Sequence, residues 1–530
     1  PCRRCELRRL DDQSSRVGDS LGGPHRFHPT MKLRSRSPGS RSVSPGPAPR
    51  SAARRIRAIE RGSAKSPVAK SPVAKAPAAH FVSPGPAPRS AARRIRALER
   101  VSATSAKETG GASVSESTFN LVKNVVGAGV LSLPAGVAAG TGLIPAIALA
   151  LLLGVFSACT FALLGRLCES TSARSFSRLG EATLGPRFGR LLAATCTAKT
   201  FFTCLAYSLV LSDAVVAILA AGGAPAALAR RTPVLIGLST LVLYPLCARA
   251  DLSRLASISL FGSCAMLYAI AFMALRYVDG SYAPGGRFFT SLPAHLRPAF
   301  DASRTAWTIT PQTLVLACGL STAFMAHYNA PAYYAGLERR SVPRFNVVVG
   351  RSFGAASGIF VAAMTIGYVT FGTASQGLIL NNYSTDDTLA TSVRIALAAS
   401  IACTYPLAFT GLRDGVLSLA ETEHATSLER RRLNVALLGA ITVLALLVDD
   451  VGFVNALGGS IFGAVLIYVY PAALFLLAER QSAGRGRRRA PRATSASQLE
   501  VRLAQATVGF GVLLSIVGSL VTVTQRYNSL

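Results

Sequence analysis

The ten cysteines of this chain do not follow the pattern that a disulfide scaffold requires. Most of them lie within apolar stretches, where cysteine behaves as a small hydrophobic residue. No framework of loop cysteines is visible, which excludes a small fold held together by disulfides. Cys2-x-x-Cys5 lacks a second pair, so it gives little support to a zinc or redox site.

Acidic residues are scarce as well, with 25 Asp and Glu against 56 Lys and Arg, which gives a formal charge of +31. This excess does not indicate a nucleic-acid partner, because no folded basic face can be recognised. Residues 1–116 hold 24 Lys and Arg against 8 Asp and Glu, and most of the remaining excess falls in short loops between apolar runs. That distribution is typical of a positive-inside membrane protein.

Residues 1–116 are poor in aromatics and rich in Pro, Ser, Ala and Arg, so we predict a disordered, basic cytoplasmic tail. The segment 43–61 recurs almost unchanged at 82–100. Each copy is either a solvated, duplicated linker or a short basic helix on an anionic membrane surface. Residues 1–30, which precede Met31, are expected to be either upstream translation or a fragment end. Candidate kinase sites in Ser-Pro pairs are Ser37, Ser44, Ser66, Ser71 and Ser83.

No apolar signal-peptide core occurs in the tail, so the first apolar segment must direct membrane insertion. Residues 117–530 contain apolar runs long enough to span a bilayer. We predict an all-α integral membrane domain with eleven transmembrane helices, its N-terminus placed in the cytoplasm by the arginines of the intervening loops. The predicted spans are 117–139, 141–166, 189–221, 232–249, 253–276, 309–330, 346–372, 388–411, 432–449, 451–478 and 502–525.

The first span carries two glycines near its middle, Gly127 and Gly129. If the helix begins at Phe119, Gly129 lies about 15 Å along it, near the midplane of a ~30 Å hydrocarbon layer. A break there would expose amide N–H groups at a half-helix N-terminus, which suits a carboxylate. The alternative is close helix packing through small residues. Asn120 and Asn124, one turn apart just before the glycines, favour the break.

The sixth span has a second interruption between Gly319 and Pro331. Small and hydroxyl residues make a weak helix around Ser321 to Phe324. The first and sixth spans are corresponding positions of two five-helix repeats, and paired breaks there predict a binding site near the midplane. His327 either relays protons or hydrogen-bonds the broken helix, and we favour the second interpretation.

Further motifs follow in order along the membrane domain. They are Phe119-Asn-Leu-x-x-Asn-x-x-Gly-Ala-Gly-x-Leu-x-Leu-Pro134, Phe324-Met-x-His-x-x-x-Pro-x-Tyr-x-x-Leu337, Gly367-Tyr-x-Thr-Phe-Gly372, Asp387-x-Leu-x-Thr391, Leu397-Ala-x-Ser-x-x-x-Thr-Tyr-Pro406, and Tyr470-Pro-Ala472 with Gly458 and Gly463. In this order and spacing they resemble the amino acid/auxin permease family, closest to its sodium-coupled neutral amino acid transporter branch. The resemblance covers 117–525 and none of the tail. It implies a LeuT-type fold of inverted five-helix repeats and secondary active transport of amino acids.

We therefore predict that a neutral amino acid binds between the two broken helices and crosses by alternating access. Its carboxylate would lie on the amides of the first break, and the sixth span would shape the pocket for its side chain. The predicted substrate-binding residues are Gly127, Ala128, Gly129, Val130, Ser321, Phe324 and Met325.

Asn124, Ser400 and Thr404 are the predicted ligands of the coupling ion. Ser400 and Thr404 are one turn apart on one helix face, and Asn124 reaches a similar depth in the first span. Their oxygens suit a hard cation such as sodium, and in the resembled branch these positions belong to the sodium site. The alternative is interhelical hydrogen bonding.

Lys199, deep in the third span, leaves the coupling ion open as Na⁺ or H⁺. It either substitutes for the charge of a bound cation, pairs with an acceptor in the cavity, or snorkels to the surface. No cofactor is expected.

We do not expect an enzyme, because no acidic or nucleophilic motif accompanies His327, and no filter-like repeat suggests a channel. The alternative function is a sensor that binds the amino acid and signals through the tail. Deleting residues 1–116 would remove the output of a sensor and leave the flux of a transporter. The expected partners are the amino acid and the lipid bilayer, in the plasma membrane or a vacuolar or lysosomal membrane.

Overall fold

The computed structural model describes residues 111–249, 259–302, 305–422, 425–484 and 498–529. These residues are mostly helical, and within them β pairing is limited to two isolated bridges, Ala112 with Leu337 and Ala299 with Gly372. The predicted all-α fold is confirmed. The duplicated segment and the Ser-Pro pairs of the tail lie outside the described residues.

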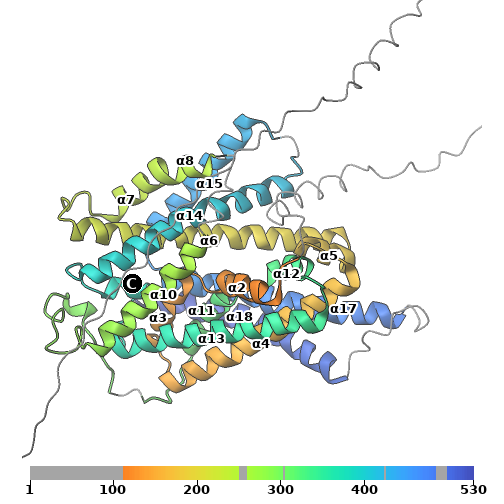
Figure 1. The fold of residues 1–530 in the computed structure, drawn as a ribbon, viewed down its shortest axis with the longest axis horizontal. Helices are drawn as coiled ribbons and strands as arrows, with labels where there is room; N and C mark the ends of the chain where they lie inside the picture. Colours follow the sequence, from red (N-terminus) through yellow and green to blue (C-terminus); the bar gives the residue numbers. More distant parts are fainter. Residues whose placement is uncertain (1–110, 250–258, 303–304, 423–424, 485–497, 530) are drawn as a thin grey trace, which may run out of the picture. The chain divides into compact units, whose positions relative to one another are not determined.

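The order of the helices along the chain can be followed in Figure 1, where the longest described connection lies between α10 and α11. They are α2 Val114–Val125, η1 Ala128–Ser132, α3 Leu133–Ala138, α4 Leu143–Thr171, α5 Phe176–Leu184, α6 Pro186–Ala221, α7 Arg231–Gly237, η2 Leu238–Leu243, α8 Tyr244–Cys247, α10 Ser259–Val278, η3 Ala294–Leu296, α11 Thr313–Ala323, η4 His327–Asn329, α12 Ala330–Gly336, α13 Val342–Phe371, η5 Ile379–Asn382, α14 Thr388–Leu419, α15 Ser427–Leu447, α16 Val451–Gly458, η6 Gly459–Gly463, η7 Val465–Val469, α17 Tyr470–Gly484 and α18 Gln498–Ser529.

Within the described part of the chain, six helices are long and apolar enough to cross a membrane. The bent pair that runs from α2 into η1 and α3 is a seventh if it counts as one span. The helices α7 to α8 and α10 are apolar but shorter. The chain is therefore a multi-pass membrane protein, as predicted, while the count of eleven spans stays a prediction.

The first predicted break is present. A capping box starts α2, in which Ser113 and Glu116 exchange hydrogen bonds of 3.2 and 2.8 Å. The helix ends at Val125. The C-cap Val126 has an extended backbone (φ −83°, ψ 92°), and Gly127 is extended as well (φ −118°, ψ −178°). The chain then resumes as η1 and α3, bent by 45° from α2.

The second predicted break is present too. α11 ends at Ala323, the residues Phe324 to Ala326 are not helical, and the chain continues through η4 into α12. Pro331 occupies the first turn of α12, where its missing N–H costs nothing. At the far end of α12, Gly336 O accepts from Ala112 N (2.8 Å) and Glu338 N donates to Ala112 O (2.9 Å).

Long helices hold the two broken segments in place. α6 packs along α14, and α13 packs along α4 (Figure 1). α2 and α3 contact α13, whereas α11 contacts α4, α16 and α18. The amphipathic α5 packs against α6 and α17. The broken segments are therefore enclosed by protein, which is where interrupted backbone is tolerated in a membrane.

A buried carboxylate ties α10 to the start of α14. Asp387 is fully buried and accepts from the Arg276 guanidinium through two bonds of 2.8 and 2.7 Å. It also accepts from Leu389 N at 3.0 Å as the N-cap of α14, and from the Tyr282 hydroxyl at 3.1 Å. Burial, and then the charge of Asp387, raise the pKa of Tyr282, so this hydroxyl stays a donor.

Asp387→Ala should destabilise the protein strongly, because it leaves the Arg276 charge without its main partner and removes a helix cap. Breaking a buried pair in this way costs about 3–5 kcal/mol. The measurement is the melting temperature of the purified protein in detergent. Asp386→Ala is the matched control, since that side chain is exposed, and equal melting temperatures for the two variants would contradict the assignment.

Candidate functional site

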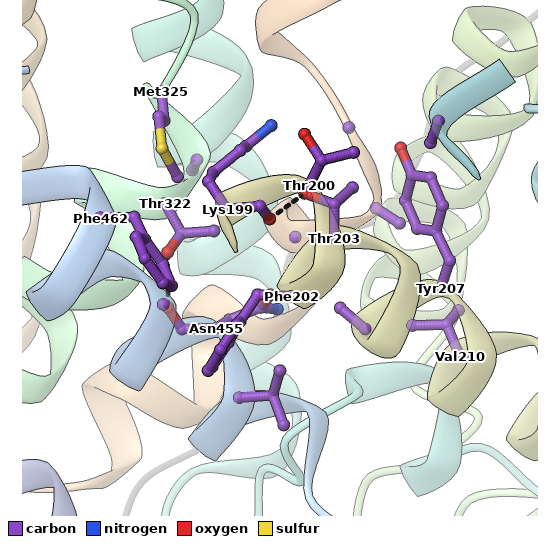
Figure 2. Close-up of a pocket in the computed structure, with 18 of the residues that line it drawn as sticks. Lys199, Thr200, Phe202, Thr203, Tyr207, Val210, Thr322, Met325, Asn455 and Phe462 are labelled. Carbon is purple, nitrogen blue, oxygen red and sulfur yellow. Dashed lines mark hydrogen bonds between the residues drawn. The ribbon is translucent and has the colours of Figure 1, made fainter. Parts of the chain in front are cut away.

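A cavity of about 350 Å³ opens where the two breaks meet α6, α14, α16 and η6 (Figure 2). Its size is that of a site for a small molecule. The described residues that line it include no aspartate or glutamate. Its polar and aromatic walls are Asn124, Lys199, Thr200, Phe202, Thr203, Tyr207, Thr322, Tyr328, Asn455 and Phe462.

The residues at the start of η1 line this cavity. Ala128 and Gly129 open the helical turn, so their N–H groups have no carbonyl of the same helix to bond. Val130 N already donates to Gly127 O at 3.1 Å. All four predicted residues, Gly127 to Val130, line the cavity. The N–H groups without a partner in the same helix are those of Ala128 and Gly129.

The two glycines of the break do not serve as a packing surface. A Cβ placed on Gly127 would meet nothing within 4 Å, and one on Gly129 would meet only Asn455 Nδ2 at 3.8 Å. Gly136, in α3, is closely packed, because a Cβ there would lie 2.9 Å from Leu316 Cδ1. The packing alternative therefore applies to Gly136, while Gly127 and Gly129 keep space open beside the backbone.

Side chains form hydrogen bonds with backbone carbonyl groups near the two breaks. Ser132 Oγ donates to Gly129 O at 2.8 Å, and Asn455 Nδ2 donates to Ser132 Oγ at 3.0 Å. Thr322 Oγ1 in turn donates to Asn455 O at 2.5 Å. This relay joins η1, α16 and the end of α11, so that Gly129 O is satisfied and the amides of η1 stay free to face the cavity.

One wall of the cavity is a stripe along α6, with Lys199, Thr203 and Tyr207 at intervals of four residues (Figure 2). Lys199 Nζ donates to the Tyr328 hydroxyl at 3.0 Å and lies 4.4 Å from the centre of the Tyr328 ring. Thr203 Oγ1 donates to Lys199 O at 3.1 Å. The stripe therefore brings one positive charge into the cavity.

Not every predicted residue of the sixth span lines the cavity. Met325 does, together with the neighbouring Thr322. Ser321 is fully buried and donates to Ala317 O at 2.9 Å. Phe324 is fully buried, stacks on Phe353 and meets Phe360 at a tilt, and it does not line the cavity. A role for Ser321 and Phe324 in binding stays a prediction, with no cavity contact to support it.

His327 holds the second break against α4. Its Nε2 lies 3.0 Å from both Thr160 Oγ1 and Ser157 O, and its ring meets the edge of Phe161. The side chain is fully buried and does not line the cavity. These contacts support the structural interpretation of His327 over a proton relay.

The three predicted ion ligands share a second cavity, of about 530 Å³, between α2, α10 and α14. Asn124, Ser400 and Thr404 line it. Thr404 Oγ1 donates to Ser400 O at 2.8 Å, and Asn124 Oδ1 accepts from Asn329 Nδ2 at 3.3 Å. The two cavities meet at Asn124, Gly127, Ala128 and Tyr207.

Toward the C-terminal end of α6, beyond the first cavity, charged groups link α6 to α7 and to the residues that precede α16. Val210 and Val451 line the cavity, and Asp213 follows one turn after Val210. Arg231 NH1 contacts Asp213 Oδ1 at 3.3 Å and donates to Asp449 O at 2.9 Å. Asn381 Nδ2 donates to Asp213 Oδ2 at 3.0 Å, and Asp449 accepts from Arg526. We call this group the α6 roof.

Sequence reasoning missed most of the walls outside the two breaks. The α6 stripe was visible as polar residues every four positions within an apolar helix, and Asn455 was visible as an amide within an apolar span. No sequence pattern indicates that Phe462 lines the cavity, because its orientation depends on the π-helical turns of η6 and η7.

Known proteins resemble the chain over most of its length. The profile of a family described as "Transmembrane amino acid transporter protein" matches residues 110–523. "Putative sodium-coupled neutral amino acid transporter 11" of Danio rerio is 24% identical over 385 residues, which are 70% of this chain and 80% of that protein. "Sodium-coupled neutral amino acid transporter 7" of Xenopus laevis is 24% identical over 68% of this chain and 80% of its own length.

A plant relative and a solved structure are also similar. "Amino acid transporter AVT6B" of Arabidopsis thaliana is 23% identical over 70% of this chain and 83% of its own length. The crystal structure of MhsT in complex with L-phenylalanine is 14% identical, covers 80% of this chain and 100% of that chain, and has a TM-score of 0.43.

Proposed function

The chain belongs to the family of transmembrane amino acid transporter proteins, and from this premise we propose that the cavity between the two broken segments binds the amino acid in transit. The observation that supports the proposal is the meeting of two half-helix ends at one cavity whose glycines leave room beside the backbone. The chain is an amino acid transporter, not an enzyme, and its substrate is a small molecule.

The polarity of the two ends matches that of an amino acid. The N–H groups that open η1 carry the positive end of a helix dipole, which attracts a carboxylate. α11 ends at Ala323 on the same cavity and presents carbonyl oxygens, which attract an ammonium group. Met325 and Phe462 supply apolar contact for the side chain. The names of the relatives make neutral amino acids the first substrates to test.

Sodium is the proposed coupling ion. Two relatives are named sodium-coupled, and Asn124, Ser400 and Thr404 offer oxygens to one cavity that adjoins the substrate cavity. A proton is the second candidate, because Lys123 also lines this cavity. Its positive charge would repel a bound sodium ion.

The N-terminus is proposed to be cytoplasmic, on the strength of the loop arginines. The C-terminal end of α6 then points away from the cytoplasm, and the α6 roof closes the cavity on that side. The membrane is proposed to be the plasma membrane or a vacuolar or lysosomal membrane, with the Ser-Pro pairs of the tail as kinase sites.

The experiment that tests this function is uptake of labelled amino acids into vesicles reconstituted with the full chain. Sodium and proton gradients are imposed separately. Accumulation that requires one of the gradients supports secondary active transport and identifies the coupling ion. Binding of an amino acid without any flux under either gradient would contradict it.

Gly129→Val should abolish transport while the protein still folds. The space beside Gly129 can accept a side chain, and a branched side chain would occupy the position of the carboxylate, which needs an approach of about 2.7–3.2 Å. Uptake in reconstituted vesicles is the measurement. Gly358→Val, at an exposed glycine of α13 with nothing within 4 Å, is the matched control, and normal uptake by Gly129→Val would rule out the carboxylate site.

Thr404→Ala should raise the sodium concentration needed for half-maximal uptake, because it removes one of the oxygens offered to the ion. A tenfold rise corresponds to about 1.4 kcal/mol of binding free energy. The sodium dependence of uptake at a fixed amino acid concentration is the measurement. Thr410→Ala, on the same helix outside both cavities, is the control. Unchanged sodium dependence in Thr404→Ala would assign this hydroxyl to packing.

Arg231→Gln should loosen the α6 roof, because Asp213 and Asp449 lose a shared cationic partner. We expect a cysteine at the cavity-lining position, Val210→Cys, to react several times faster with an impermeant thiol reagent added on the side of the roof. Arg230→Gln, at the exposed neighbouring arginine, is the control. Equal rates in both backgrounds would mean that the roof does not control access.

A further inference from the structure

Lys199 is the one lysine or arginine among the described residues that line the substrate cavity. It lies on α6, 13 residues after Pro186 in a helix of 36 residues, which is deep in the membrane. A charged side chain at that depth is costly unless it faces a cavity and finds a partner. Lys199 does face a cavity, so the question is which group compensates its charge.

The protein itself does not supply that group among the described residues. The polar contact of Lys199 Nζ is the neutral Tyr328 hydroxyl at 3.0 Å, with the ring of the same residue 4.4 Å away. Within the described part of the chain, no ion pair includes Lys199. The one acidic residue of α6, Asp213, lies about 21 Å further along the helix and contacts Arg231 instead.

The cavity therefore contains one full positive charge and no lining carboxylate. A neutral amino acid cannot balance it, because its carboxylate is used by the amides of η1 and its ammonium group is positive. A second carboxylate on the substrate would balance it. In Figure 2 the Lys199 side chain lies between Met325 and Thr200, and all three residues line the cavity.

We propose that Lys199 binds the side-chain carboxylate of an acidic amino acid, so that the substrates of this cavity include dicarboxylic amino acids. This inference rests on the proposed function and names a specificity-determining residue for it. The second carboxylate accepts from Lys199 Nζ, which has three donors and uses one of them on Tyr328. The α-carboxylate stays at η1, and the net charge of −1 on the acidic amino acid cancels the positive charge of Lys199, so that the occupied cavity is neutral.

The test compares L-glutamate with L-glutamine, which differ in one carboxylate and are almost equal in shape. Both labelled compounds are offered to vesicles that hold the full chain, and the concentration for half-maximal exchange is measured. We expect the wild type to exchange glutamate. Lys199→Gln should raise the half-maximal glutamate concentration at least tenfold and change that of glutamine less than twofold, while Lys199→Arg should keep glutamate exchange.

Arg190→Gln removes a positive charge from the same helix at a position that is 65% exposed, and it should change neither value. Equal losses for both substrates in Lys199→Gln would overturn the proposal and make the lysine a structural partner of Tyr328. Wild-type exchange of glutamine without glutamate would overturn the proposal and leave the proposed function intact. Failure of the wild type to exchange any amino acid would reject the proposed function itself.

Discussion

The fold depends on the rule that backbone polar groups within a membrane must be bonded inside the protein. A helix can be interrupted there only if other groups replace its lost bonds. At the first break, Ser132 and Asn455 do this for Gly129 O, and at the second, His327 anchors the linker to α4. The first amides of η1 have no carbonyl of the same helix to bond, and their residues line the cavity. The proposed binding site therefore uses backbone groups that the interrupted helix leaves available.

The same rule explains why the two breaks could be predicted from the sequence. Gly127 and Gly129 in the middle of an apolar span weaken the helix, and Pro331 after a run of small residues marks a second weak point. These signals are local, because they depend on which residue occupies a position rather than on its neighbours in space. The fold class and the joint position of Asn124, Ser400 and Thr404 followed from the same kind of information.

Side-chain direction was not accessible in this way. Ser321 and Thr322 are adjacent hydroxyl residues on α11, yet Thr322 lines the cavity and Ser321 packs against the backbone near Gly463. A rotation of about 100° per residue separates them, and the sequence contains nothing that fixes where the rotation starts. The same uncertainty applies to Phe324, which the sequence predicts in the pocket and which instead contacts Phe353 and Phe360 without lining the cavity.

The backbone pairing of Ala112 with the end of α12 decides where the tail can be shortened without disturbing the membrane domain. A deletion that ends at residue 110 leaves this pairing and the Ser113 cap of α2 intact. A deletion that ends at residue 116 removes the backbone pairing and the Ser113 cap. The end of α12, the helix that follows the second break, then loses its hydrogen bonds to Ala112. A loss of flux after the longer deletion would then reflect a released helix rather than a lost signal. Only the shorter deletion distinguishes signalling through the tail from transport by the membrane domain.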